Sequence, residues 1–341
     1  MSPETPFATT LNYDDDPRWF RRAHVIEFPR GVIGEFRTLI SIVRAAFQHE
    51  TLVLDSSSGR FHPDVLAAAL IGFLPRRVRP TIVLTGCMWA RDQGFSRLLQ
   101  TFTMNLADRG ITAYAVQSSE ELTVFPETWG VSPDKVHFSP YFYSLTEDDI
   151  HRLESTPGDV PFLGRYVFAG GNSHRDYEPL LAAAQHFPDV QFVIATSRLQ
   201  RRQDLPPNVM AGPLPHEDFV RLMKGAAAVY TPIAGGLTRA AGQQTYLNAM
   251  RLGVPTIVSD GFAVRDHIEH GQTGLIIDGS VESIVMTLQW LFNPANCSEV
   301  EAMVQRAQEV VMARFTFERF VTQTLAIVDA AIEGRQRVSF R

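Results

Sequence analysis

The sequence has only two cysteines, Cys87 and Cys297, in 341 residues. Two cysteines cannot build a disulfide framework, and neither has cysteine or histidine neighbours at the spacing that holds zinc. Isolated cysteines are typical of proteins from a reducing compartment. We therefore expect a cytoplasmic protein without a metal site.

Long apolar runs and a basic excess are also absent. No stretch reaches the ~18–20 apolar residues that a membrane-spanning helix needs. The first residues, MSPETPFATTLNYDDDP, are polar and acidic, unlike the basic and then apolar pattern of a signal peptide. The net charge is −6 and the pI about 5.9, whereas nucleic-acid-binding proteins usually show a basic face and a high pI. We expect no membrane span and no nucleic-acid partner.

The segment after this acidic start, Arg18-Trp-Phe-Arg-Arg, is both basic and aromatic. Such residues find partners at an anionic membrane surface, which would give a weak peripheral contact at the inner membrane face. Five residues are too few for an amphipathic anchor, however. We favour packing on the domain, or simple solvation, over membrane contact.

The length suits two domains of ordinary size. Short β-branched strands, the first at His24–Pro29, alternate with amphipathic helices, and this alternation predicts α/β domains with parallel sheets. One such helix, Glu35–Phe47, has apolar residues at 36, 39, 40, 43 and 47, the spacing of a core-facing stripe. The predicted division is a flexible tail (1–17), an N-terminal Rossmann-like domain (18–155), a C-terminal Rossmann-like domain (156–315) and a last helix (316–341).

The second half is organised around the stretch from Tyr230 to Gly279, which is a strand, a glycine-bearing loop, a helix and a strand. Small residues at 240–242 let backbone approach a ligand, and Gln243, Gln244 and Thr245 open the helix with free N–H groups. Helix N-termini hold phosphates because these N–H groups and the helix dipole both point at the anion. From the residues alone, an ordinary crossover whose glycines only make a turn is an equally good interpretation.

The order G-Q-x-x-x-L-x-A-M-x-x-G-x-P-x-I-V-x-D, followed by G-x-T-G-L-I-I, resembles the donor-binding segment of GT-B glycosyltransferases, in particular the retaining glycosyltransferase family four (glycosyl transferases group 1). The matching residues are Gly242, Gln243, Leu247, Ala249, Met250, Gly253, Pro255, Ile257, Val258, Asp260, Gly271, Thr273, Gly274 and Leu275. The resemblance implies an α/β protein of GT-B fold, with two Rossmann-like doubly wound parallel-sheet domains facing a cleft. It also implies an N-terminal acceptor domain, a C-terminal nucleotide-sugar domain and a last helix that crosses back to the first domain.

The sequence departs from the family at two positions. Many members carry two glutamates eight positions apart in this segment, one touching the donor sugar and one the ribose. Here these positions are Ala240 and Asn248. Asn248 can still hydrogen-bond a ribose hydroxyl, but Ala240 cannot replace a carboxylate, so the donor sugar stays open.

The resemblance assigns the donor site to several short segments. Gly170, Gly171 and Asn172 would lie at the diphosphate, and Arg175 stands where the family has a lysine. Arginine binds phosphate in a bidentate manner, so the replacement keeps the chemistry, although Arg175 could instead be an exposed charge at a helix start. The remaining candidates are Thr196 and Ser197 at a strand end, Leu214 at the base, the helix start Gly242, Gln243, Gln244 and Thr245, and Asn248 at the ribose.

These residues predict a glycosyltransferase that moves a sugar from a nucleotide diphosphate sugar, expected to be a UDP- or GDP-sugar, to a hydroxyl acceptor. The acceptor, a glycan, a lipid-linked molecule or a small molecule, is not selected by the sequence, although polysaccharide biosynthesis fits. The resemblance implies retention of anomeric configuration. Electrostatic stabilisation of the leaving diphosphate, with Arg175 as its main residue, needs no metal and no cofactor beyond the donor.

Two alternatives stay open. One is another GT-B chemistry, such as a nucleotide-sugar epimerase or hydrolase, and the other is a non-catalytic nucleotide-sugar-binding protein, which the positions of Ala240 and Asn248 favour. Family members often place a histidine of the N-terminal half near the reacting sugar. The candidates are His24, His49, His62 and His137, and for each of them a surface or core role is the favoured interpretation.

Overall fold

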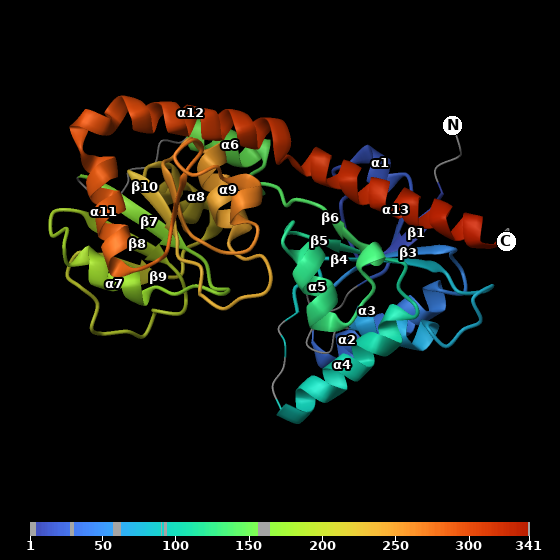
Figure 1. Cartoon of the computed structure of the whole chain (residues 1–341). Helices are drawn as coiled ribbons and strands as arrows, with labels where there is room; N and C mark the ends of the chain where they lie inside the picture. The colour runs from blue at the N-terminus through green and yellow to red at the C-terminus, as the bar shows by residue number, and fades with distance from the viewer. Residues whose placement is uncertain are drawn as a thin grey trace. The chain divides into compact units, whose positions relative to one another are not determined.

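The computed structural model describes residues 5–27, 31–56, 63–89, 91, 94–155 and 164–339. Contacts divide the chain into two units, Met1–Pro140 with Glu318–Arg341, and Tyr141–Phe317. Each unit holds a six-stranded sheet whose neighbouring strands are parallel, with helices on its faces (Figure 1). The predicted class, two Rossmann-like α/β domains, is confirmed.

The sheet of the first unit has the strand order β2-β1-β3-β4-β5-β6. The strand bounds are β1 (Phe7–Thr9), β2 (Ala23–Val25), β3 (Thr51–Asp55), β4 (Thr81–Thr85), β5 (Ala113–Val116) and β6 (Val136–Phe138). The central strands β3 and β4 are nearly continuous runs of Leu, Val and Ile and are buried along their length. This composition is typical of parallel strands that are covered on both faces.

Strand β1 overturns part of the tail predicted over residues 1–17. Phe7–Thr9 pairs in parallel with β2 on one side and β3 on the other. Phe7 is completely buried, and its ring meets Trp19 edge-on with centroids 4.9 Å apart. A strand of three residues is too short to show a period-2 pattern. The acidic residues that follow it also make the whole segment look polar, so composition does not indicate a strand. One of those acids, Asp16, caps helix α1 (Pro17–Phe20) by accepting backbone N–H bonds.

Helices cover both faces of this sheet (Figure 1). One hydrophobic cluster joins alternate strand residues to the helices α2 (Val32–Ala45), α3 (Pro63–Ile71), α4 (Gly94–Asp108) and α5 (Glu121–Trp129). The opposite face carries α1 and the C-terminal helix α13 (Phe317–Ser339). A single 3-10 turn, η1 (Pro133–Lys135), leads into β6.

Helix α13 is tied to the first unit through the basic-aromatic segment at 18–22. Arg22 is buried and pairs with Asp329 at 2.6 Å, and Arg18 pairs with Asp16 and donates to the Thr322 hydroxyl. Trp19 is fully buried beneath them. The structure therefore uses this segment for packing, the interpretation that the sequence favours.

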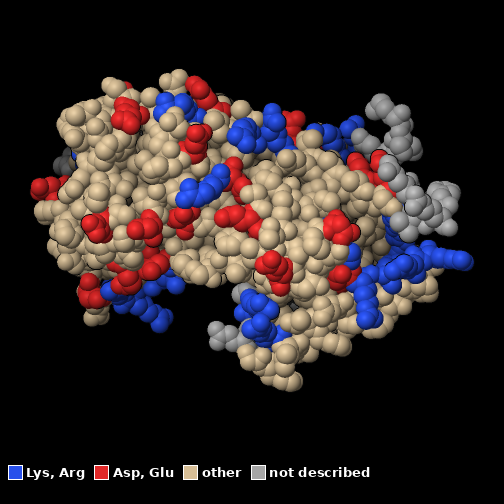
Figure 2. Space-filling model, in the orientation of Figure 1, with Lys and Arg blue, Asp and Glu red and all other residues tan. Residues whose placement is uncertain are grey.

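The outer face of α2 differs from the sequence prediction. Phe36, Ile40 and Phe47 of the predicted core-facing stripe are exposed, whereas the buried side consists of Gly34, Glu35, Thr38, Ile42 and Ala45. The prediction is wrong because mostly small or short side chains line the close contact between α2, the sheet and α3. Figure 2 shows the visible surface of this helical layer as mostly neutral residues with basic ones beside them.

The sheet of the second unit has the order β12-β11-β10-β7-β8-β9. The strand bounds are β7 (Tyr166–Gly170), β8 (Gln191–Ala195), β9 (Val209–Gly212), β10 (Ala228–Thr231), β11 (Thr256–Ser259) and β12 (Leu275–Ile277). The chain runs outward from β7 to β9, returns to the other side of β7, and then runs outward from β10 to β12. The strand order therefore reverses between β7 and β10.

The helices of the second unit are α6 (Glu147–Ser155), α7 (Glu178–Ala184), α8 (His216–Lys224), α9 (Gln243–Arg251), α10 (Val264–His267), α11 (Val281–Phe292), the turn η2 (Pro294–Asn296) and α12 (Cys297–Arg314). Helix α6 precedes the boundary predicted at 155/156, yet its Ile150 and Leu153 pack on the core of this second unit. Within the described ranges, no helix is long and apolar enough to cross a membrane.

Candidate active site

The reversal between β7 and β10 sets the place of the site. In open parallel sheets, ligands bind beyond the carboxyl ends of the strands where the order reverses. The segments that leave these two strands meet there, because Arg175 after β7 forms an isolated antiparallel bridge with Ile233 after β10. Gly170, Gly171 and Arg175 lie on the first segment, and Gly242 ends the second.

Arg175 is buried at this point, with 6% of its surface exposed. Its Nε donates to the Gly170 carbonyl at 3.2 Å, one terminal nitrogen to the Ser173 carbonyl at 2.7 Å, and the other to the Thr245 hydroxyl at 3.2 Å. No carboxylate of the described chain pairs with it. Burial lowers the pKa of Arg175, and neighbouring Arg198 adds to this effect. A buried cation without an anionic partner is costly, so the arrangement is suited to an anion.

Two glycines with left-handed φ angles make room for this guanidinium. A Cβ on Gly171, at φ 113°, would lie 3.0 Å from an Arg175 terminal nitrogen. A Cβ on Gly242, at φ 79°, would lie 2.8 Å from the Thr231 methyl and 3.5 Å from Arg175. Gly170 is also tightly enclosed, since a Cβ there would meet the Phe219 ring at 2.5 Å. Close packing with these neighbours therefore requires glycine at all three positions, while their role toward a ligand stays a prediction.

Gly242→Ala is expected to destabilise the fold by about 1–3 kcal/mol, from the left-handed backbone cost and the overlap with Thr231. It should also weaken anion binding, because the added Cβ would lie 3.5 Å from an Arg175 terminal nitrogen. Urea unfolding measures the first effect. Gly271→Ala is the matched control, since Gly271 has φ 74° with nothing within 4 Å of its Cβ. If both variants lose the same stability, the close fit around Gly242 is not a constraint.

The start of α9 is the second element of the site. Gly242 is its N-cap, and no side chain caps the helix. Gln243 and Thr245 are buried, Gln244 is exposed, and the Thr245 hydroxyl accepts from Arg175. The positive end of the helix dipole and the guanidinium therefore point to the same region, as an anion site requires.

A third group links the ends of β7 and β8. Asn172 Oδ1 accepts from the Thr196 hydroxyl at 2.8 Å, the Ser197 N–H at 2.9 Å and the Ser197 hydroxyl at 3.0 Å. Tyr177 donates to the Gly171 carbonyl at 2.7 Å. The structure thus brings Asn172, Thr196 and Ser197 together, and the Tyr177 hydroxyl holds the carbonyl of the glycine loop in place.

The other candidates lie apart from this network. Leu214 is half-buried and packs on the core beside α8. Asn248 accepts from the Ser144 N–H at 2.9 Å and donates to the Ser144 hydroxyl at 3.1 Å. Ala240 is buried and offers no polar group. The roles predicted for Leu214 and Asn248 stay predictions.

Three further cationic or imidazole side chains surround Arg175, and the sequence reasoning missed them. Arg198 donates to the Arg175 carbonyl at 2.6 Å, and Arg239 lies against the His174 ring. Burial is the main cause that lowers the pKa of His174, and the charges of Arg239 and Arg175 lower it further. The backbone of His174 also has a left-handed φ of 53°, a conformation that is uncommon for residues other than glycine. The available signals were Arg198 right after the Thr196-Ser197 strand end and Arg239 in the glycine-bearing loop.

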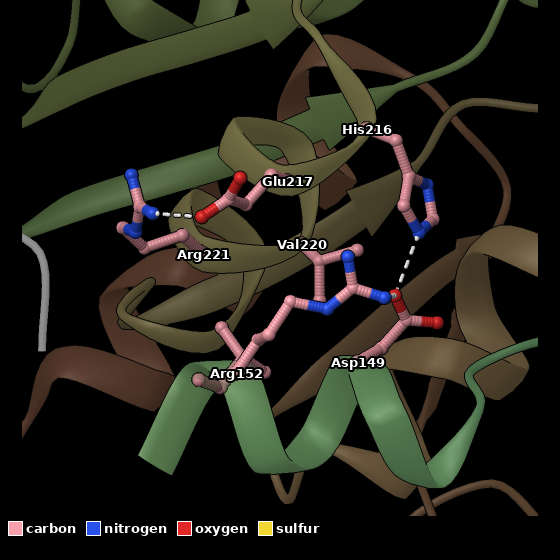
Figure 3. Close-up of a pocket in the computed structure, with 7 residues that line it drawn as sticks. Asp149, Arg152, His216, Glu217, Val220 and Arg221 are labelled. Carbon is pink, nitrogen blue, oxygen red and sulfur yellow. Dashed lines mark hydrogen bonds and ion pairs between the residues drawn. The ribbon is translucent and has the colours of Figure 1, made fainter. Parts of the chain in front are cut away.

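A small pocket elsewhere in this unit involves different residues. It lies between α6 and α8 and is lined by Asp149, Arg152, Leu153, His216, Glu217, Val220 and Arg221 (Figure 3). His216 meets Asp149 at 3.2 Å, and Arg221 meets Glu217 at 2.8 Å. Its charges already neutralise one another, and none of the predicted site residues lines it.

Among the described residues, no three His, Cys, Asp or Glu side chains gather as metal ligands. His24 and His49 lie against each other with ring centroids 5.1 Å apart, and burial lowers the pKa of the half-buried His137. His62 lies outside the described residues. Nothing in these contacts selects one histidine.

Comparisons with known proteins agree with this geometry. Residues 167–293 match the family model described as Glycosyl transferases group 1. The structure resembles Anabaena HepE in complex with UDP and glucose (TM-score 0.65, 14% identity, 95% of this chain and 91% of that chain). It also resembles a glycosyltransferase from Rickettsia africae (0.64, 11%, 96% and 90%) and sucrose-phosphate synthase from Thermosynechococcus elongatus (0.65, 15%, 92% and 84%). No curated protein sequence matches significantly.

The fold is that of the GT-B glycosyltransferases, and the segment that matches their family model lies in the second unit. Within that class, the segment that carries Arg175 and the start of α9 is the one that matches glycosyl transferases group 1. The resemblance inferred from the sequence is confirmed.

Proposed function

We propose that the chain transfers a sugar from a nucleoside diphosphate sugar to a hydroxyl acceptor, and that the second unit binds the donor. The observation that carries this is the buried Arg175 guanidinium, which has no ion pair with any described residue and adjoins the start of α9, where no side chain caps the helix. A diphosphate would neutralise the buried cation and accept hydrogen bonds from the first helical turn.

The same groups supply a mechanism. When the bond between the sugar and the diphosphate breaks, negative charge grows on the leaving oxygen. Arg175, Arg198 and the N–H groups of Gln243 and Gln244 would stabilise that charge from fixed positions. These cations take the role that a metal ion plays elsewhere, so we propose metal-independent transfer. Retention of configuration is proposed from the family resemblance.

We propose a UDP-sugar as donor. The similar Anabaena HepE binds UDP and glucose, and this supports uracil over other bases. Gly170, Gly171 and Asn172 would face the diphosphate, and Thr196 and Ser197 would border it from β8. Leu214 and the backbone after β9 would contact the base. A ribose contact from Asn248 would have to replace its bonds to Ser144.

A non-catalytic nucleotide-sugar-binding protein is the second candidate. Two observations favour it: Ala240 is buried without a carboxylate, and the Asn248 side chain is already engaged by Ser144. An epimerase or hydrolase of the same fold would consume the donor without an acceptor. The three functions therefore differ in turnover, while all of them bind the donor.

Thermal unfolding with UDP, GDP, ADP, TDP and CMP and their common sugar conjugates tests the donor site. A ligand at 100 times its Kd should stabilise the protein by about 2.7 kcal/mol. We expect a uridine ligand to do so without magnesium, and added magnesium to change the shift little. If no ligand of the panel raises the unfolding temperature, the proposal of donor binding is wrong. After a positive result, donor consumption with and without sugar acceptors separates transfer, hydrolysis and binding alone.

A further inference from the structure

Helix α4 exposes a complete apolar stripe to solvent. Phe95, Leu98, Leu99 and Phe102 follow one another at helical spacing and are 60–82% exposed. The opposite side of the helix is anchored by Met104 and Ala107, which are buried. The helix is thus apolar on both sides, although packing within the unit uses only one of them. An apolar stripe of this size rarely faces water without a binding role.

Helix α2 repeats the feature. Ile33 is 74% exposed, Phe36 66% and Phe47, just after the helix, 69%. These residues lie on the side away from the buried Thr38 and Ile42. Two separate helices of one layer therefore present large apolar side chains outward.

Helix α3 lies between α2 and α4 and joins their faces. It is rich in alanine, and its neighbours approach closely: a Cβ on Gly110 would lie 2.4 Å from the Ala68 carbonyl oxygen. Leu70 and Phe73, 52% and 67% exposed, add apolar surface at the end of α3. Tight packing makes the three helices one platform, which we term the α2–α4 face.

The fully exposed charges of the α2–α4 face are positive. The exposed charged side chains of the three helices are Arg37, Arg44 and Arg97. Of the acids, Glu35 and Asp64 are buried, and the half-buried Asp108 pairs with Lys135 at 3.0 Å. Arg76, Arg77 and Arg91 are exposed in the adjoining loops, and the exposed acid Glu50 lies in the loop after α2. Figure 2 shows basic side chains beside the neutral surface at the lower edge of this layer. The face therefore offers aromatic and aliphatic groups rimmed by guanidinium groups.

We propose that the α2–α4 face docks on an anionic lipid bilayer. Phe and Leu side chains would enter the boundary between headgroups and acyl chains, and the arginines would meet the anionic headgroups. A second copy of the chain fits less well, since a two-fold contact would set arginines mainly against arginines. The inference stands apart from the proposed function, because it uses no residue of the donor site.

Co-sedimentation of the full chain with vesicles tests the proposal. With vesicles of phosphatidylcholine and phosphatidylglycerol at 60:40 we expect binding that falls at least about tenfold in 0.5 M NaCl, and little binding to pure phosphatidylcholine. Phe95→Ser/Phe102→Ser should reduce binding at least about tenfold, and Arg37→Gln/Arg97→Gln by less. Met286→Ser/Met312→Ser removes exposed apolar residues of the other unit and should bind as the natural protein does.

Two outcomes would overturn the proposal. One is equal vesicle binding by the Phe95→Ser/Phe102→Ser variant and the natural protein, with thermal unfolding confirming that both are folded. The other is absence of binding to anionic vesicles together with a dimer, seen by light scattering, that the same variant abolishes. That second result would assign the α2–α4 face to a second copy of the chain.

Discussion

Arg175→Ala should weaken the binding of a nucleoside diphosphate by about 1.5–3 kcal/mol, the scale of hydrogen bonds to charged groups. This corresponds to roughly a 10- to 150-fold rise in Kd, at 1.4 kcal/mol per decade. The reason is that Arg175 is the buried cation of the site, and no carboxylate in the described part of the chain competes for it. Titration calorimetry with UDP measures the change directly. The Kd of Arg175→Lys should lie between those of the natural protein and Arg175→Ala, because lysine keeps the positive charge but lacks the planar guanidinium group.

Arg175→Ala also removes three hydrogen bonds that Arg175 donates, so its effects on stability and on binding must be measured separately. Unfolding without nucleotide measures the change in stability. The additional stabilisation that nucleotide produces measures the change in binding. Arg202→Ala is the matched control, since Arg202 lies in the same unit but pairs with Glu178 and Asp204 at the surface. An unchanged UDP affinity in folded Arg175→Ala would remove Arg175 from the donor site.

The organising stretch shows what sequence can predict. The five apolar positions assigned to its helix, Tyr246, Leu247, Ala249, Met250 and Leu252, are all buried. The helix ends at Arg251, and Gly253 after it has the left-handed φ of 67° that glycine permits. These features can be predicted because each depends on residues that are close in sequence: the spacing of apolar residues, and the glycine and proline that end a helix.

The features that sequence did not show depend on contacts between distant segments. β1 is a three-residue strand that becomes visible only when its two neighbours pair with it. The apolar residues of α2 that include Phe36 have the same helical spacing as residues that face a core. They are exposed because the other side of α2 packs against α3 and the sheet. In the site, Arg175 was found by position, whereas Arg239 meets His174 across 65 residues of chain. No local pattern reports such a contact.

A second large effect is expected at Asp64, the buried carboxyl group at the start of α3. Burial raises the pKa of Asp64 from 3.8 to about 7, with the charge of Asp55 adding to it and the nearby Ser56 hydroxyl opposing it. Between these two values the folded protein keeps a proton that the unfolded chain has released. Folding stability should therefore fall as pH rises from about 4 to 7, and this loss should level off above pH 7.

The size of the effect follows from the pKa difference. At 1.36 kcal/mol per pKa unit the loss is roughly 4 kcal/mol, and more than half of it falls between pH 5 and 8. Asp64→Asn cannot ionise, so its free energy of unfolding should decline less over this range, by roughly 2–3 kcal/mol. Urea unfolding at pH 5, 6, 7 and 8 provides the comparison. The slopes within each protein are compared, since the amide changes the absolute stability as well.

Asp15→Asn is the control, because Asp15 is an exposed carboxylate of the same unit and should leave the slope unchanged. Parallel curves for Asp64→Asn and the natural protein would mean that Asp64 is ionised and compensated in the folded state. A flatter curve would instead establish a neutral acid beyond the carboxyl end of β3.

Burial raises the pKa of Cys87, and the charges of Glu121, Asp64 and Asp55 add to this effect. A neutral Asp64 would remove one of these charges, but burial alone would keep the thiol protonated, and Cys87 would act only as a small apolar side chain of this core.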